Sequence, residues 1–498
     1  MKKIVTIFLA VLIMTCTFVP VTANAELAET CDYYLAVYSN EAVQKVPIPK
    51  AFTHTLTIRN IDDSVPKFNS PSDLFIDESD NIYIVDSGNN RIVKTDRYGN
   101  LIGIFDTVEG SSSATFNNPG GIYVDSDEDM YIADTNNNRI VHLGKDGEFI
   151  EEFGKPDAEA LRGYPFDPTK VYISNTGIIY VLLKTDFQGF MMISNQGEYL
   201  GSTGSTWVTS TFWDYIWRRF GSDEQLVSQS SLVAPPYQNF IMDANGWIYA
   251  TVGTVEEDQI VKLNSQGTNT YPKGVYGEIL ESTPENISKY TGLTPNMTDI
   301  AVDSDNMIYV LDRNLCRVYM YDQNGNNLAF FGDRGNITGK FMTPISIGVM
   351  SDGTIAVLDM DASMLCVQLF APTSFAETVI SGTVLYNDGL YEEAREYWNT
   401  VLSMDENYMF AHRSIARALV KDGEYREAMA EYKLADDKEG YSTAFENYKD
   451  SLIQNGFFFV VLGVVVIIIL LILAFKKLKR YADKLHLRYT TWIGGEDE

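Results

Sequence analysis

The sequence predicts a mainly β protein, a six-bladed β-propeller, followed by paired α-helices and a single transmembrane helix. Three observations lead to this prediction. A unit of short strands recurs along residues 66–371, a helical pattern recurs along 372–455, and residues 456–475 form an uncharged apolar run. Several short strands in a period of ~40–50 residues are typical of propellers. An apolar run of about 20 residues can cross a membrane as a helix.

The first 25 residues have the features of a signal peptide. Lys2 and Lys3 precede an apolar stretch, which ends in the small-residue pattern Ala23-Asn24-Ala25. This order of charge, apolar core and small residues is what signal peptidase accepts. We therefore expect an exported protein whose mature chain begins at Glu26.

The strand unit is clearest in two copies, residues 71–99 and 119–147, which align with a constant offset of 48. A third close copy lies around 295–331, and weaker copies follow Pro168, surround Asp243 and follow Pro344. Each copy contains four short apolar runs separated by Gly, Asn or Asp turns, so each predicts one four-stranded antiparallel blade. Six copies predict six blades.

The sixth unit ends early, because Pro372 and a helical pattern follow Phe370 directly. The extension formed by residues 26–65 contains a β-rich run, Thr53–Ile58, that has no blade of its own. We expect this run to supply the missing outer strand, which would join the two ends of the ring and remove an exposed sheet edge.

The best copies follow the pattern Pro-x-x-apolar-x-apolar-Asp, then Asn-x-Tyr-apolar-x-Asp-x-x-x-Asn-x-Arg-Ile. At 71–105, 119–153 and 295–331 this pattern resembles the NHL repeat. The resemblance implies a six-bladed propeller. It implies no single function, because NHL propellers include scaffolds, sensors, hydrolases and lyases.

In residues 372–455, matching residues recur with an offset of 34; the pairs include Gly389/Gly423, Ala394/Ala428 and Trp398/Tyr432. This period resembles the tetratricopeptide repeat, a stack of helical hairpins. Peptide binding in a groove is one function that the resemblance implies. A stiff spacer between the propeller and the membrane is the other, and we favour it.

Residues 456–475 contain no charged side chain, and a basic cluster begins at Lys476 in the tail 476–498. Basic residues beside a span mark its cytoplasmic end. Together with the signal peptide, this predicts a single-pass cell-membrane protein whose N-terminus is extracellular and whose C-terminus is cytoplasmic.

The chain is acidic, with 67 Asp and Glu residues against 38 Lys and Arg residues and a formal net charge of −29. Such a charge argues against nucleic acid as a partner. The layout resembles that of Gram-positive bacterial proteins associated with carbohydrate transport. It implies a membrane protein or an extracellular ligand, including a carbohydrate, as the partner.

The residues 202–235 between the third and fourth units are unusually long for a link and hold the aromatic and basic side chains Trp213, Tyr215, Trp217, Arg218 and Arg219. A lid helix packed on the propeller is one interpretation, and a docking surface for a sugar or a membrane partner is the other. Loops on a rigid scaffold commonly bind ligands, so Asn89, Asn136 and Asn137 are further candidates.

Four aspartates end the second strands of their units: Asp86, Asp134, Asp312 and Asp359. Carboxylates converging on the axis could bind Ca²⁺, which prefers oxygen ligands. We favour a second interpretation, in which each aspartate caps its own loop and the first three face the arginine five residues later. Apart from this calcium hypothesis, we expect no cofactor.

No catalytic signature for a zinc, serine-nucleophile or phosphate-binding site is present in the sequence. We therefore favour a noncatalytic, membrane-anchored binding or scaffold protein. The alternatives are a calcium-dependent propeller hydrolase or lactonase, motivated by the four aspartates, and an extracytoplasmic sensor subunit that signals through another chain.

Overall fold

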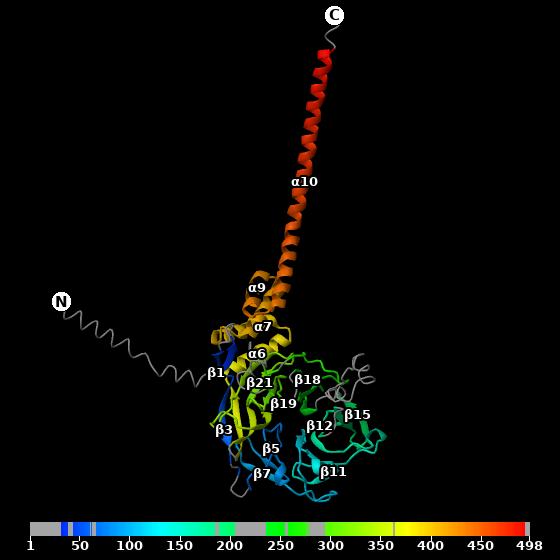
Figure 1. Ribbon diagram of the computed structural model, residues 1–498, viewed down its shortest axis with the longest axis vertical. Helices are drawn as coiled ribbons and strands as arrows, with labels where there is room; N and C mark the ends of the chain where they lie inside the picture. The colour runs from blue at the N-terminus through cyan, green and yellow to red at the C-terminus, as the bar shows by residue number, and fades with distance from the viewer. Residues whose placement is uncertain are drawn as a thin grey trace, which may run out of the picture. The chain divides into compact units, whose positions relative to one another are not determined.

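The structure is a computed structural model that describes residues 31–37, 43–59, 61, 66–184, 189–204, 236–253, 257–274, 276–277, 294–361 and 364–493. The chain divides into two units, residues 1–384 and 385–498. Six sheets of the first unit follow one another around a ring, which makes it a six-bladed propeller (Figure 1). This confirms the predicted six-bladed propeller.

In every blade the strands are antiparallel and the first one lies innermost. Blade 1 consists of β4 (Asp73–Ile76), β5 (Ile82–Asp86), β6 (Arg91–Thr95) and β7 (Leu101–Phe105). Blade 2 consists of β8 (Gly121–Val124), β9 (Met130–Asp134), β10 (Arg139–Leu143) and β11 (Phe149–Phe153). Blade 3 consists of β12 (Pro168–Ile173), β13 (Ile179–Leu183), β14 (Phe190–Ile193) and β15 (Tyr199–Thr203).

Blades 4 to 6 are less regular. Blade 4 consists of β16 (Tyr237–Met242), β17 (Ile248–Val252) and β18 (Ile260–Leu263). Blade 5 consists of β19 (Met297–Val302), β20 (Ile308–Asp312), β21 (Arg317–Tyr321) and β22 (Asn327–Phe331). Blade 6 consists of β23 (Pro344–Val349), β24 (Ile355–Asp361) and β25 (Met364–Pro372), with β3 (Phe52–Ile58) as its fourth strand.

The repeated Asp and Tyr stabilise the first hairpin together in blades 1 and 5. In blade 1, Oδ1 of Asp77 accepts hydrogen bonds from the backbone N–H groups of Ser79 and Asn81, at 2.9 and 2.8 Å. Its Oδ2 accepts the hydroxyl of Tyr83 at 3.1 Å. The carboxylate thereby accepts hydrogen bonds from the turn and from the strand that follows it, which explains the fixed spacing of six residues between the aspartate and the tyrosine.

Blade 4 has three strands among the described residues, because a proline interrupts the segment that would form the fourth. The N–H of Thr270 donates to the carbonyl of Lys262 at 2.8 Å, and the N–H of Asp258 donates to the carbonyl of Gly274 at 2.7 Å. Both contacts belong to one antiparallel register, in which Pro272 lies between them. Proline has no N–H to donate, so the ladder cannot continue through it.

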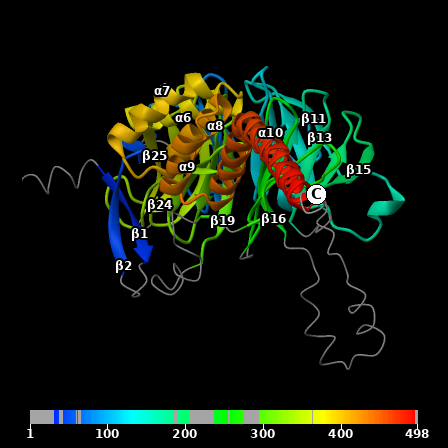
Figure 2. The ribbon, with the colours of Figure 1, turned by 90° about the horizontal axis from the view of Figure 1, so that it is seen from above.

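The ring is closed by strands from opposite ends of the propeller sequence. β3 pairs with β25 in antiparallel register from Ile58 opposite Val367 to Phe52 opposite Pro372. Thr373 continues the contact, since its Oγ1 donates to the carbonyl of Lys50 at 2.6 Å. Before β3, the strands β1 (Cys31–Val37) and β2 (Val43–Pro49) pair only with each other within the described residues and form a two-stranded ribbon (Figure 2).

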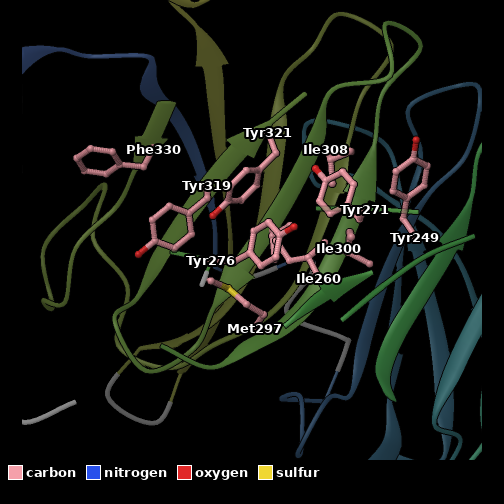
Figure 3. Close-up of a cluster of buried hydrophobic side chains, with 11 residues drawn as sticks. Tyr249, Ile260, Tyr271, Tyr276, Met297, Ile300, Ile308, Tyr319, Tyr321 and Phe330 are labelled. Carbon is pink, nitrogen blue, oxygen red and sulfur yellow. The ribbon is translucent and has the colours of Figure 1, made fainter. Parts of the chain in front are cut away.

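Apolar and aromatic side chains fill the space between neighbouring sheets. Figure 3 shows the cluster between blades 4 and 5, which is rich in tyrosine. Tyr271 and Tyr276 are stacked with ring centroids 5.6 Å apart. The hydroxyl of Tyr271 donates to the carbonyl of Asp322 at 2.8 Å, so this ring is buried without losing its polar contact.

Helices follow the propeller along the chain: α6 (Ser374–Asn387), α7 (Tyr391–Met404), α8 (Met409–Asp422), α9 (Tyr425–Leu434) and α10 (Lys438–Ile493). In the second unit, Ala394 and Ala428 are fully buried, and so is Trp398, whose ring meets Phe410 edge-on at 5.4 Å. Gly423 ends α8 in the left-handed conformation, with φ +82°, which glycine adopts without strain.

α10 is one continuous helix of 56 residues, ~84 Å long at a rise of ~1.5 Å per residue. By length and composition it could cross a membrane, and the large apolar side chains described between residues 457 and 475 are exposed. A helix that is apolar on every side is typical of a membrane span.

Candidate functional site

The loops between the second and third strands lie at the same end of the blades as the links that enter each blade, an end we call the link face. In blade 1 this loop includes the short 3-10 helix η1 (Ser87–Asn89). It is held by Asp86, whose Oδ2 accepts Arg91 Nε at 2.7 Å and Asn89 Nδ2 at 2.8 Å. Oδ1 of Asp86 accepts the backbone N–H of Asn69 in the incoming link at 2.7 Å.

Blade 2 repeats this arrangement around η2 (Thr135–Asn137). Asp134 accepts Arg139 Nε at 2.8 Å, Asn137 Nδ2 at 2.8 Å and the N–H of Asn117 at 2.7 Å. Asp134 is completely buried. These carboxylates are therefore committed to the loops of their own blades, the second of the two interpretations given to them above.

Arg139 also pairs with Glu152 of the outer strand at 2.7 Å. Partial burial of Glu152 would raise its pKa, but hydrogen bonds from Ser112 and Arg139 outweigh burial and lower it. Glu152 thus stays ionised at neutral pH.

Blade 5 departs from this pattern. Oδ1 of Asp312 accepts three backbone N–H groups, from Asn296, Asn314 and Leu315, at 3.1, 2.9 and 3.0 Å. Its Oδ2 is buried and has no hydrogen-bond partner among the described residues. Arg317, which the sequence placed opposite it, instead lies over the ring of Phe330. Burial raises the pKa of Asp312.

In blade 6, Asp359 accepts the backbone N–H groups of Met342 and Thr343, the latter at 2.8 Å. Within the described parts of the chain, no three or more Asp, Glu, His or Cys side chains are grouped so that they could hold a metal ion. A calcium site shared by Asp86, Asp134, Asp312 and Asp359 therefore has no geometric support in these residues.

The structure separates the other predicted residues into three groups. Asn89 and Asn137 are partly buried and bind the incoming links as well as the aspartates, through the carbonyls of Lys67 and Thr115. Asn136 is exposed. The aromatic and basic candidates Trp213, Tyr215, Trp217, Arg218 and Arg219 lie outside the described residues.

A second polar region lies at the propeller axis, and sequence reasoning missed it. It is formed by one position near the start of each innermost strand, which in blades 1, 2, 3 and 6 lies two residues after a proline. The six residues at this position are Asp73, Gly121, Lys170, Asn239, Asp299 and Ser346.

Lys170 and Asp73 are joined across blade 2. Nζ of Lys170 lies 2.5 Å from Oδ1 of Asp73, and both side chains are largely buried. The pair passes Gly121, where an added Cβ would lie 2.8 Å from Cδ of Lys170 and 3.0 Å from Oδ2 of Asp73. The absence of a side chain in blade 2 is thus what lets blades 1 and 3 meet.

Asp299 occupies the opposite side of this network. Its Oδ1 accepts Asn239 Nδ2, and its Oδ2 accepts the N–H of Ile347 at 2.8 Å and contacts Ser346 Oγ at 2.5 Å. Ser346 Oγ also lies 3.2 Å from Oδ1 of Asp73. Burial raises the pKa of Asp299 to about 6, although the charge of Lys170 opposes the shift.

A cavity of about 130 Å³ lies along the axis beside Asp73, Lys170 and Asn239, and its wall includes Phe75, Tyr123 and Tyr172. The rings of Tyr123 and Tyr172 are 4.4 Å apart. This volume exceeds the ~10–15 Å³ that one water needs, but is below the ~300 Å³ at which drug-sized ligand pockets begin. The axis can hold waters or a very small solute beside a satisfied ion pair.

Comparison with known proteins places part of the chain in a repeat family. Residues 116–143, which span blade 2 from its incoming link to its third strand, match the NHL repeat. The chain therefore carries an NHL repeat within a six-bladed propeller. No curated protein matches the chain in sequence.

Solved structures resemble the chain only distantly. A streptogramin B lyase matches at 12% identity and a TM-score of 0.38, over 68% of this chain and 93% of its own. A virginiamycin B lyase from Staphylococcus aureus gives 12% and 0.38, over 69% and 96%. Regucalcin from Agrobacterium tumefaciens, a calcium-binding protein, gives 11% and 0.39, over 64% and 93%. Similarity at this level assigns no role to any residue.

Proposed function

We propose that this protein is a noncatalytic binding protein held at the cell membrane by α10. The observation that carries this proposal is the state of the two buried carboxylates at the link face of blades 1 and 2. In blades 1 and 2 the buried carboxylates of Asp86 and Asp134 are each paired with an arginine and with loop amides. A proton-transfer or metal centre needs carboxylates that are not already committed in this way.

The membrane attachment is supported by the order of features along α10. The uncharged residues 456–475 are followed on the same helix by Lys476, Lys477, Lys479 and Arg480. This order favours a cytoplasmic C-terminus and an extracellular propeller. The helices α7 to α9 would then be a tetratricopeptide-like spacer, in which Ala394 and Ala428, 34 residues apart, occupy matching buried positions.

The partner that the layout suggests is a membrane protein, and by resemblance a component of a carbohydrate transport system. To test the proposal, the full chain carries a C-terminal affinity tag, is crosslinked in its own cells, and is purified in detergent for mass spectrometry. The control is a chain that ends at residue 455. We expect a reproducible membrane partner with the full chain. A full chain that alkaline carbonate extracts from membranes, or that has no partner at native expression, would overturn the proposal.

Orientation is tested with single cysteines on α10. Glu439→Cys and Lys479→Cys flank the apolar run, and a membrane-impermeant maleimide on intact cells should label the first variant but not the second. The unmodified chain supplies the background from its own cysteines, of which Cys316 and Cys366 are buried. The reverse labelling would reject the proposed topology.

A further inference from the structure

An uncharged row of amide side chains crosses blades 1 and 2 at the link face. It is formed by exposed asparagines from the incoming links and the loops between second and third strands, and we call it the amide ridge: Asn69, Asn90, Asn117, Asn118, Asn136 and Asn138. Two of the three loop candidates named from the sequence, Asn89 and Asn137, lie beneath it as supports.

Hydrogen bonds make the amide ridge continuous. In blade 1, Asn69 Nδ2 donates to the carbonyl of Gly88 at 3.2 Å. The N–H of Asn118 donates to Asn90 Oδ1 at 2.7 Å, which joins the blade 1 loop to the link that follows. Asn136 Nδ2 then contacts Asn117 Oδ1 at 3.4 Å, which joins that link to the blade 2 loop.

These bonds leave much of the ridge free. Among the described residues, no partner is present for Nδ2 of Asn90 and Asn117, for Oδ1 of Asn136, or for the side-chain amides of Asn118 and Asn138. The free set therefore contains both donors and acceptors. All five residues belong to the exposed surface of two adjacent blades that are fixed by buried ion pairs.

Backbone conformation explains only part of this composition. Asn90, Asn118 and Asn138 have left-handed φ values of +55°, +49° and +53°, which favour asparagine, aspartate or glycine. The other three ridge asparagines have no such constraint. In a chain with 67 acidic residues, six exposed amides without one carboxylate among them are not accounted for by turn geometry.

The charged side chains that hold the ridge loops are buried beneath it: Asp86 pairs with Arg91, and Asp134 pairs with Arg139, which also pairs with Glu152. No exposed charged residue is adjacent in the sequence to a ridge asparagine, and the nearest one along the chain is Lys67. A surface of this kind neither attracts nor repels ions strongly, so it favours an uncharged ligand. Amides offer donors and acceptors side by side, as sugar hydroxyl groups do.

A protein partner fits the ridge less well. Protein interfaces depend on aromatic or large apolar anchors in pockets. The exposed large apolar residues of blade 1 are Tyr98, Ile102 and Ile104, which lie on the turn into the outer strand and on that strand, away from the loops of the ridge. We propose that the amide ridge binds uncharged oligosaccharides through their hydroxyl groups, an inference that rests on the proposed binding function.

The test uses the full chain, purified in an amine-oxide detergent so that no sugar headgroup competes. The probes are immobilised maltoheptaose and cellohexaose, with hexagalacturonate as a charged probe of similar size. The variant Asn136→Asp/Asn138→Asp keeps side-chain shape, removes two amide donors and adds two negative charges. The control Gln196→Glu/Gln266→Glu adds the same charge on exposed turns at the opposite end of blades 3 and 4.

We expect the unmodified chain to bind a neutral probe, the ridge variant to bind it at least tenfold more weakly, and the control to stay within twofold. Unchanged melting temperatures would show that both variants fold. Equal binding by the ridge variant would overturn the site, and binding to hexagalacturonate alone would overturn the ligand class. If no probe binds while a membrane partner still copurifies, the carbohydrate inference fails and the proposed function stands.

Discussion

Nζ of Lys170 lies 2.5 Å from Oδ1 of Asp73, although the innermost strand of blade 2 separates their blades. This contact is the centre of a network in which blades 1, 3, 4, 5 and 6 contribute side chains. Blade 2 contributes the N–H of Ile122, which donates to Oδ2 of Asp73 at 3.2 Å. The six blades are thus connected by polar contacts at the axis as well as by apolar packing between sheets.

Replacing Lys170 with methionine should destabilise the propeller strongly. The substitution leaves the buried carboxylate of Asp73 without its partner, which typically costs about 3–5 kcal/mol. Chemical unfolding at pH 7.5 measures the loss. The double variant Lys170→Met/Asp73→Asn should recover most of it, because the unpaired charge is then gone. A single variant as stable as the unmodified chain would show that the pair contributes little.

Ionisation of Asp299 should make the propeller less stable at neutral than at mildly acidic pH. Its folded-state pKa of about 6 lies above the ordinary 3.8, so the folded chain binds the proton more tightly than the unfolded chain. Stability from this residue is therefore greatest at low pH and is lost as pH rises between about 4 and 6. Relative to Asp299→Asn, the unmodified chain should gain about 2 kcal/mol from pH 7 to pH 4. Parallel pH profiles for the two chains would contradict this assignment.

Gly121 should tolerate no side chain. An alanine Cβ would lie 2.6 Å from the carbonyl oxygen of Thr169 and would crowd the Lys170–Asp73 pair. We expect Gly121→Ala to lower the unfolding free energy by about 1–3 kcal/mol, the usual cost of overpacking. Gly154→Ala is the matched control, since an added Cβ there meets nothing within 4 Å. Equal stability of the two variants would refute the crowding argument.

Arginines at matching positions of blades 2 and 5 should differ in their contribution. Arg139 is buried and pairs with Asp134 and Glu152, whereas Arg317 lies over Phe330, with its guanidinium carbon 5.1 Å from the ring centroid. Arg139→Leu should cost about 3 kcal/mol or more, and Arg317→Leu about 1 kcal/mol. Thermal and urea unfolding of the two variants compare them directly. A larger loss at Arg317 would reverse the ranking.

The number of blades and the closure of the ring by β3 could be predicted from the sequence, because both depend on the spacing of the repeated residues. The contact between Asp77 and Tyr83 recurs between Asp303 and Tyr309 in blade 5 at the same six-residue spacing, so these copies align. Because the sixth unit ends early, its fourth strand had to come from another part of the chain, and β3 supplies it. Pairing of Asp86 with Arg91 follows from the same five-residue spacing, but that spacing could not show that Arg317 turns toward Phe330.

The axial network could not be predicted in the same way. Asp73, Gly121 and Lys170 hold one position in three copies and share no chemistry, so each reads as variation between repeats. Their relationship exists only when the innermost strands stand around one axis. The available signal was a polar or glycine residue near the start of an apolar strand, which in four of the six copies lies two residues after a proline.

Pairing of β3 with β25 also determines the order in which the ring can be finished. Ile58 pairs with Val367, so β3 is synthesised about 300 residues before β25, the strand with which it pairs. Until then blades 1 to 5 can assemble from neighbouring segments, but β3 has an open edge and the first and last blades have no bond between them. Completion of the ring must therefore be a late and slow step, since contacts so distant in sequence form slowly.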